Sequence, residues 1–352
     1  MLKKKIGLLM GALFLTMILF ACGNNDAANG NSNSGGNTVS LATYPPGLAF
    51  NSAASGVATV VSEQSDLKMN IRTFTSPDAW LPMLDKGEVD LGFTDSTSQW
   101  HYKGTAMAAD EPMSNLRTIV TGNRIINVGF VAREDSDVNS LADLKGRKIG
   151  DYKSNEEAIA ELLNIQLESV GLSYEDGTSV PVSGVEQGMD LLRSNKADVT
   201  FGGAPDAGLF LDVDSTVGIK GFSYGDYDVD QIEEVREKHG EEVAERYPNG
   251  ELVVAEGGFL DEPIIAIDFP TVLLSHDAFA EEKVYEITKT LFENYEELQP
   301  LFNWLEDWEP DTMFTENPPV PYHDGAIKYF EEAGLWTNEA KEHHEALLNE
   351  VN

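Results

Sequence analysis

Polar residues that could hold a small solute follow several short apolar runs of this sequence. They are Thr43 and Tyr44, Asp95 with Ser96 and Thr97, Tyr152 with Ser154 and Asn155, and Gly203 to Asp206 with Pro205 between them. In open α/β sheets, residues that follow the strands border the crevice where ligands bind. Each group also has a purely structural interpretation, in which Ser154 caps a helix, Tyr44 packs on Pro45, and Asp95 caps a turn.

The charge of the ligand is predicted from two features. Free backbone N–H groups near Ser154, at an expected helix start, favour an anionic group such as a carboxylate. Arg124 is the best candidate for a cation, because it directly precedes an expected crossover strand and would face the cleft. The alternative for Arg124 is a surface salt bridge, and replacement by Ala separates the two hypotheses.

Catalytic machinery is hard to assemble from this sequence. None of the six histidines has the spacing that places two imidazoles on one helix face. There is no Gly-x-Ser-x-Gly elbow, and Gly202-Gly203 lacks the lysine and spacing of a phosphate-binding loop. We therefore predict no metal, no cofactor and no enzymatic activity.

Two similar stretches organise the elements that would carry these residues. The first, residues 76–96, has Ser76-Pro77 as a helix start, Gly87 as its end, and then an apolar run. The second, residues 189–203, repeats the order of leucine, turn, aspartate, apolar pair and polar loop. Two such units predict two lobes that face one cleft, with Asp90 playing a structural role at its strand.

The remaining elements favour a mostly parallel sheet with helices on its faces. Strands are expected at residues 39–43, 70–74, 116–120 and 125–132. Ser154 with Glu157, and Ser183 with Glu186, are predicted capping boxes that open helices. Residues 226–250 are interpreted as an acidic surface excursion, and residues 263–275 as a β-rich segment that returns to the first lobe.

Length and composition set the domain organisation. A chain of 352 residues can hold two domains. We expect residues 1–21 to be a signal peptide, 22–38 a flexible tether, 39–124 plus about 263–352 the first lobe, and about 125–262 the second. The formal net charge of -36 argues against nucleic acid or an anionic membrane surface as a partner.

The N-terminus predicts an extracytoplasmic location. Lys3 to Lys5 form a basic region, residues 6–20 an apolar run of signal-peptide length, and Cys22 follows. This arrangement resembles the lipobox of bacterial lipoproteins, which implies lipidation of Cys22. The alternative is a free cysteine in an uncleaved anchor helix. Either arrangement tethers the body of the protein outside the cytoplasmic membrane.

Several longer stretches resemble the TAXI branch of TRAP-transporter solute receptors. They are residues 84–93, 138–146, 269–274, 284–292 and 322–330, with Tyr-Glu-Ile-Thr-Lys at 285–289 and His-x-Gly-Ala at 323–326 the more specific pieces. The likeness covers most of the chain after Thr38. The sequence departs from the family in its first loop, residues 42–47, and at Asp324, where proline is usual.

This resemblance implies a two-lobed, type II periplasmic-binding-protein-like fold with a hinge and a central cleft. It also implies capture of a dicarboxylate or an acidic amino acid and its delivery to a sodium-coupled TRAP membrane permease. By position, ligand-facing residues would be near Tyr44, Ser52, Asp95 to Thr97, Tyr152 to Asn155, and Gly203 to Pro205. The alternatives are an ABC-importer substrate-binding lipoprotein or a solute-sensing lipoprotein.

Overall fold

The computed structural model describes residues 36–106 and 111–351. These residues belong to a single compact unit. The predicted signal peptide, Cys22 and nearly all of the predicted tether lie outside the described residues. Within the described ranges, no helix combines the length and the apolar character needed to cross a membrane.

The first sheet contains six strands in the order β10-β11-β3-β1-β2, with β4 paired to β11. The strands are β1 (Thr38–Thr43), β2 (Lys68–Thr73), β3 (Leu91–Asp95), β4 (Leu116–Asn127), β10 (Glu251–Ala255) and β11 (Ile264–His276). β1 is parallel to both of its neighbours, β2 and β3, whereas β11 is antiparallel to β3, β4 and β10. All five residues of β3 are buried, including the polar residues Thr94 and Asp95 at its end.

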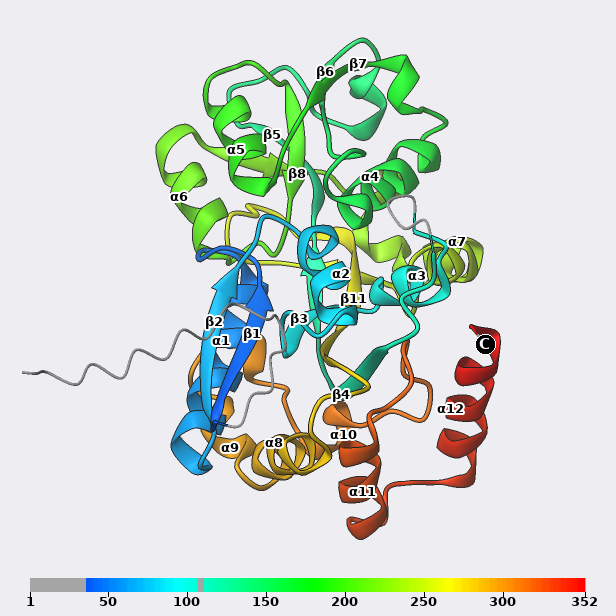
Figure 1. The fold of residues 1–352 in the computed structure, drawn as a ribbon. Coiled ribbons are helices and arrows are strands. Elements are labelled where there is room, and N and C mark those ends of the chain that lie inside the picture. The colour runs from blue at the N-terminus through cyan, green and yellow to red at the C-terminus, as the bar shows by residue number, and fades with distance from the viewer. Residues whose placement is uncertain (1–35, 107–110, 352) are drawn as a thin grey trace, which may run out of the picture. The chain divides into compact units, whose positions relative to one another are not determined.

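The second sheet contains five strands in the order β7-β6-β8-β5-β9. They are β5 (Gly129–Arg133), β6 (Lys148–Asp151), β7 (Thr178–Pro181), β8 (Val199–Gly202) and β9 (Ile219–Gly221). Figure 1 shows these strands among the green elements, and the first three strands of the first sheet in blue and cyan. Two sheets flanked by helices confirm the predicted α/β, two-lobed class.

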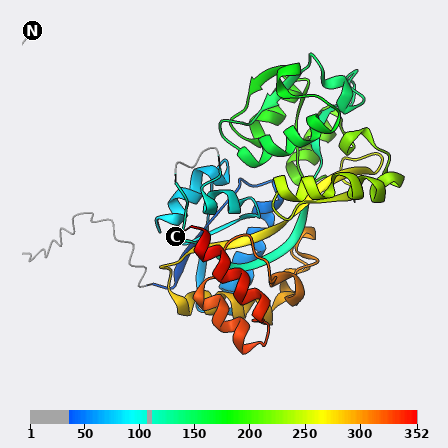
Figure 2. The ribbon, with the colours of Figure 1, turned by 90° about the vertical axis from the view of Figure 1, so that its right-hand side faces the viewer.

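Helices cover both sheets, as Figures 1 and 2 show. They are α1 (Ala49–Gln64), α2 (Pro77–Asp85), α3 (Ser98–Lys103), α4 (Glu157–Ser169), α5 (Val185–Arg193), α6 (Gly208–Val217), α7 (Ile232–Arg246), α8 (Glu281–Glu293), α9 (Tyr295–Leu298), α10 (Pro310–Met313), α11 (Asp324–Glu332) and α12 (Asn338–Glu350). Short 3-10 turns occupy Leu141–Leu144, Tyr174–Asp176, Tyr224–Asp226, Val229–Gln231 and Asn303–Leu305. Alanine and valine side chains of α1 are buried, which matches its small-residue stripe.

The two similar stretches of the sequence occupy equivalent positions in the two sheets. A carboxylate oxygen of Asp90 accepts a hydrogen bond from the backbone N–H of Ser40, at 2.8 Å. Asp198 accepts one from the backbone N–H of Lys148, also at 2.8 Å. Each aspartate therefore ties the start of its strand to a neighbouring strand, which confirms the structural role predicted for Asp90.

The chain passes from the first sheet to the second with only Val128 between β4 and β5. Gly129 has a φ of +90°, which favours glycine, and a Cβ there would lie 2.2 Å from the Gln166 amide. That amide of α4 donates to Val128 O and accepts from the Phe130 N–H, both at 2.9 Å. The crossover is thus fixed to α4 by one side chain.

Some local expectations differ from the structure. α4 begins at Glu157 with Glu156 at its N-cap, so Ser154 is an exposed residue ahead of the helix and does not cap it. Gly184 precedes α5, and the Ser183 N–H and hydroxyl donate to Gln187 and not to Glu186. A capping motif indicates a helix start, but competing turn contacts decide which residue the helix begins at.

Sheet membership also differs from the expected lobe ranges at two points. β4 continues to Asn127 within the first sheet, and β10 pairs with β11 in that same sheet. Both segments fall inside the range 125–262 that was expected in the second lobe. The reason is that β11 is long enough, at 13 residues, to pair with β4, β3 and β10 together.

Candidate functional site

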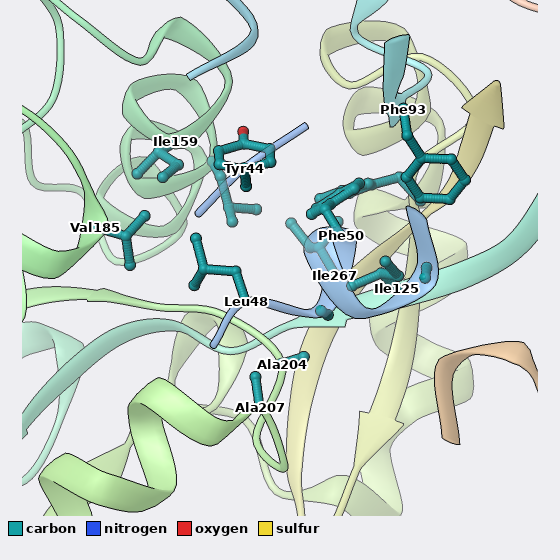
Figure 3. Packing of buried hydrophobic residues seen from close by; sticks show 14 of the residues in the cluster. Tyr44, Leu48, Phe50, Phe93, Ile125, Ile159, Val185, Ala204, Ala207 and Ile267 are labelled. Atoms are coloured by element: carbon teal, nitrogen blue, oxygen red, sulfur yellow. The ribbon is translucent and has the colours of Figure 1, made fainter. Parts of the chain in front are cut away.

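A small enclosed cavity lies where elements of the two sheets meet. Its volume is about 40 Å³, which is room for roughly three water molecules. Residues of both lobes line it: Tyr44, Leu48, Ala49, Phe50, Asp95, Ile125, Asn127, Ala158, Ile159, Leu162, Val185, Phe201, Gly203, Ala204, Phe210, Tyr247 and Phe269. Figure 3 shows Tyr44 and Leu48 of the first lobe converging with Ile159 and Val185 of the second.

A buried hydrogen bond joins the lobes beside this cavity. The Tyr44 hydroxyl donates to Glu156 Oε1 at 2.5 Å, and Glu156 is only 1% exposed. Its second oxygen, Oε2, is buried without a hydrogen-bond partner. Burial raises the pKa of Glu156 well above its ordinary value, although the hydrogen bond from Tyr44 opposes that rise. Burial and the nearby Glu156 likewise raise the pKa of Tyr44.

A second buried carboxyl group, that of Asp95, lines the cavity at the end of β3. Its Oδ1 accepts hydrogen bonds from the backbone N–H of Thr97 at 2.8 Å and from the Thr97 hydroxyl at 2.5 Å. Burial raises the pKa of Asp95 to about 6, against the lowering effect of these two bonds. Thr97 therefore holds the carboxyl group in place, and Asp95 presents it to the cavity.

Further contacts connect the two lobes around the cavity. The backbone N–H of Glu157 donates to Asp78 Oδ2 at 3.1 Å, and that of Leu209 donates to Gly47 O at 3.0 Å. The other carboxylate oxygen of Asp78 lies 3.0 Å from Nε2 of His101, which is buried. The structure is thus a closed arrangement in which the lobes touch directly.

Arg124 does not line this cavity, contrary to the prediction that it faces the cleft. Its Nε and one terminal nitrogen donate to Asp268 Oδ1 at 2.9 and 2.8 Å, and the terminal nitrogen also reaches Asn249 O at 2.7 Å. Glu251 lies 3.4 Å from its other terminal nitrogen. The cause is the pairing of β4 with β11, which sets Arg124 opposite Pro270 and close to Asp268. Arg124 therefore forms salt bridges, as the alternative hypothesis for this residue predicted.

The other predicted site residues divide into two groups. Tyr44, Asp95 and Gly203 line the cavity, and Thr97 supports Asp95. The rest do not line it: Ser52 is on α1, Ser96 donates to Pro248 O, Tyr152 bonds Thr200, Ser154 is exposed, Asn155 donates to Val182 O, and Pro205 accepts from Phe259. Ser52 and Asn155 contribute local hydrogen bonds and no cavity surface.

Two residues of the cavity region were missed by the sequence interpretation. Glu156 directly follows the predicted group at Tyr152 to Asn155, so an acidic residue at that helix start was the available signal. Tyr247 lies in the stretch interpreted as a surface excursion, yet it is 1% exposed and stacks on Phe269 with ring centroids 4.6 Å apart. The only sequence signal that Tyr247 is buried was an aromatic residue within an otherwise acidic stretch.

The site contains no arrangement suited to a metal ion. Within the described ranges, no cluster of three or more His, Cys, Asp or Glu side chains could hold one. The polar side chains that line the cavity are those of Asp95, Tyr44, Tyr247 and Asn127, and the rest of the wall is apolar. Such a set can hold a small solute by hydrogen bonds and apolar contact.

Three solved structures are similar to this chain over most of its length, and one of them reaches a TM-score of 0.50. A protein of Bordetella bronchiseptica RB50 is 15% identical, with a TM-score of 0.50 over 88% of this chain and 98% of that one. The aliphatic sulphonate binding protein of Escherichia coli is 12% identical, covering 89% and 86%, with a TM-score of 0.44. The alkanesulfonate-binding protein of Xanthomonas axonopodis pv. citri, bound to MOPS, is 15% identical, covering 90% and 85%, with a TM-score of 0.47.

The two sheets, the crossovers between them and the enclosed cavity form the two-lobed α/β fold of periplasmic binding proteins, as predicted. A family model described as the NMT1-like family matches residues 41–334. That range includes both sheets apart from the first residues of β1, and every residue that lines the cavity. The chain belongs to the NMT1-like family.

Proposed function

We propose that this protein is an extracytoplasmic solute-binding protein that serves a membrane transporter. The observation that carries the proposal is the enclosed cavity, whose wall comes from both lobes and whose rim is bridged by Tyr44 and Glu156. Closing two lobes over a solute removes it from water and needs no chemical reaction. The residues around the cavity offer binding groups and no activated nucleophile.

Closure and release follow from the two kinds of connection between the lobes. The covalent crossovers near Val128 absorb the change in angle, whereas the bonds from Tyr44 to Glu156 and from Glu157 to Asp78 form only when the lobes meet. A solute that contacts both walls stabilises the closed state by its differential affinity for it. The transporter then recognises that state.

For the transporter, we favour an ABC-type importer, with a sodium-coupled TRAP permease as the second candidate. The matching family is described as NMT1-like and not as a TRAP receptor, and the sulphonate-binding proteins above share the fold. Uptake by cells that carry the neighbouring permease genes distinguishes the two. Dependence on ATP supports the importer, and dependence on a sodium gradient supports the permease.

Attachment to the membrane through Cys22 is a separate proposal, supported by the basic and apolar residues before it. Replacing Cys22 by Ala should release the protein from the membrane fraction, and mass spectrometry of the wild-type N-terminal peptide should show a lipid on the thiol. A cleaved, unlipidated wild-type protein would contradict this.

A thermal-shift screen of small solutes tests the binding function. A ligand at 100 times its Kd adds about 2.7 kcal/mol to the free energy of unfolding, which is a readily measured rise in Tm. We expect at least one solute to raise Tm and to be recovered unchanged. Product formation, or no shift across organic acids, amines, amino acids and sugars, would overturn the proposal.

A further inference from the structure

We propose that the cavity binds an organic cation, with an amine or ammonium head beside Asp95 and a small apolar body against aromatic side chains. This proposal rests on the solute-binding function proposed above and names its ligand class. It replaces the small organic anion that the resemblance and the helix start near Ser154 predicted.

The walls of the cavity suit a cation with an apolar body. Six of the lining residues are aromatic: Tyr44, Phe50, Phe201, Phe210, Tyr247 and Phe269. Tyr44 and Phe50 lie with ring centroids 5.2 Å apart, and Phe201 and Phe210 lie 6.3 Å apart in an edge arrangement. Aromatic faces attract alkylammonium groups through their quadrupoles, and more strongly where water is excluded. An anion would face the same electron-rich surfaces with repulsion.

The carboxyl group that lines the cavity has an acceptor oxygen without a donor. Asp95 uses Oδ1 for both of its hydrogen bonds with Thr97, and its Oδ2 accepts none from a described residue. Beside the cavity, Glu156 Oε2 is also buried without a hydrogen-bond partner. A buried acceptor left without a donor costs about 1–3 kcal/mol. A ligand that brings N–H donors and a positive charge would satisfy these oxygens.

No positive side chain balances these carboxyl groups at the cavity surface. Among the described residues that line the cavity there is no Lys, Arg or His. His101, which is near enough to lower the pKa of Asp95, is paired with Asp78, and Arg124 is paired with Asp268. A bound carboxylate would therefore be buried beside Asp95 with no counter-ion, which is strongly unfavourable.

The volume limits the ligand to a small molecule. A cavity of about 40 Å³ fits a group of only a few non-hydrogen atoms while the lobes stay closed. At about −1.5 kcal/mol per atom, a four-atom ligand binds no more tightly than about 40 µM. Binding of this strength is measurable by calorimetry.

A matched three-carbon series tests the inference: n-propylammonium, n-propanol and propionate, in a phosphate buffer at pH 8 that contains no amine. We expect n-propylammonium to bind at least tenfold more tightly than n-propanol, and propionate not to bind. Binding of propionate but not of the amine would overturn the cation inference and leave the solute-binding function in place. If none of the three compounds binds, and no solute in the wider screen raises Tm, both the cation inference and the proposed solute-binding function are overturned.

Variants locate the binding. Asp95→Asn should weaken n-propylammonium binding at least tenfold and remove the preference over n-propanol. Asp190→Asn is the matched control, because it removes the same charge from an exposed position on α5 and should change nothing. If Asp95→Asn does not fold, as circular dichroism would reveal, Glu156→Gln takes its place, since glutamine still accepts from Tyr44. Unchanged affinity in the folded variant would overturn the assignment.

Discussion

Two hollows of this molecule contain charged side chains, and they differ in whether those charges are satisfied. The cavity between the lobes is about 40 Å³, and Asp95, which lines it, accepts both of its side-chain hydrogen bonds on one carboxylate oxygen. The groove beside Arg124 is about 960 Å³, and there the guanidinium is bound by Asp268, Asn249 and Glu251. In the large groove, the guanidinium of Arg124 is already paired with protein groups. In the small cavity, one carboxylate oxygen of Asp95 has no donor.

This difference shows why a charge alone does not identify a binding site. Arg124 can leave its partners for a ligand only by exposing Asp268, whose pKa is already raised by burial. Asp95 can gain a hydrogen bond on Oδ2 from a donor in the cavity while Oδ1 keeps both of its bonds from Thr97. The unsatisfied group is therefore the better guide to a ligand, and the following predictions test that comparison.

The largest effect is expected from filling the cavity. Ala158→Leu adds three carbon atoms to a wall residue of α4 and should weaken solute binding by about 100-fold or more, because the added side chain takes the ligand's space. Calorimetry measures the loss. Ala142→Leu, at an exposed position, is the control and should bind normally. Normal affinity in Ala158→Leu would place the site elsewhere.

A smaller loss is expected from removing the bond between the lobes. Tyr44→Phe leaves Glu156 Oε1 buried without its donor, at a cost of about 1–3 kcal/mol in the closed state. Solute affinity should fall roughly tenfold. Glu156→Leu in the same background completes a double-mutant cycle, because leucine cannot accept the hydrogen bond from Tyr44. Additive effects of the two changes would mean that the bond does not contribute.

The pH dependence should show the titration of Asp95. Because burial raises the pKa of Asp95 from 3.8 to about 6, the folded state binds more protons than the unfolded state between these values. The contribution of Asp95 to stability therefore falls, by about 3 kcal/mol, as pH rises through that window.

Cation affinity should change in the opposite direction, rising about tenfold from pH 5 to pH 7, since the ionised carboxyl group is the counter-ion. The other charged groups near Asp95 are Asp78 and His101, with Glu156 across the cavity. Calorimetry from pH 5 to 8 on wild type and Asp95→Asn measures the step. A step that persists in Asp95→Asn would assign it to another of these groups.

The smallest effect on binding is expected at Arg124. Arg124→Ala should change solute affinity less than twofold, while it lowers the free energy of unfolding by about 1–3 kcal/mol because Asp268 loses its partner. Urea unfolding and calorimetry on one preparation separate the two. Adding Asp268→Asn should recover part of the stability. A tenfold loss of affinity would bring Arg124 back into the site.

Local patterns were sufficient to predict the fold and one side of the site. The repeated unit around Asp90 and Asp198 predicted two related sheets, and the rule that ligands lie beyond strand ends selected Tyr44, Asp95 and Gly203. These features depend on periodicity and on residues that are neighbours in the chain.

The pairings that decide the chemistry could not be predicted in that way. Tyr44 and Glu156 are 112 positions apart, and Arg124 and Asp268 are 144 apart. No spacing rule connects such residues, because the sheet topology and the closure of the lobes bring them together. Our proposal of a cation depends on these pairings, whereas the local argument from Arg124 and the helix start predicted an anion.

Helix α4 contacts the crossover between the sheets near one end and the cavity near the other. Gln166 holds the crossover at Val128 and Phe130, while Glu156 and Ile159 near the other end of the helix lie at the cavity. Because α4 contacts both the crossover and the cavity, a movement at the crossover also moves the cavity wall. The contacts of Gln166 therefore influence the rate at which the solute dissociates. Loosening that end, as in Gln166→Leu, should speed dissociation and leave the ligand preference unaltered.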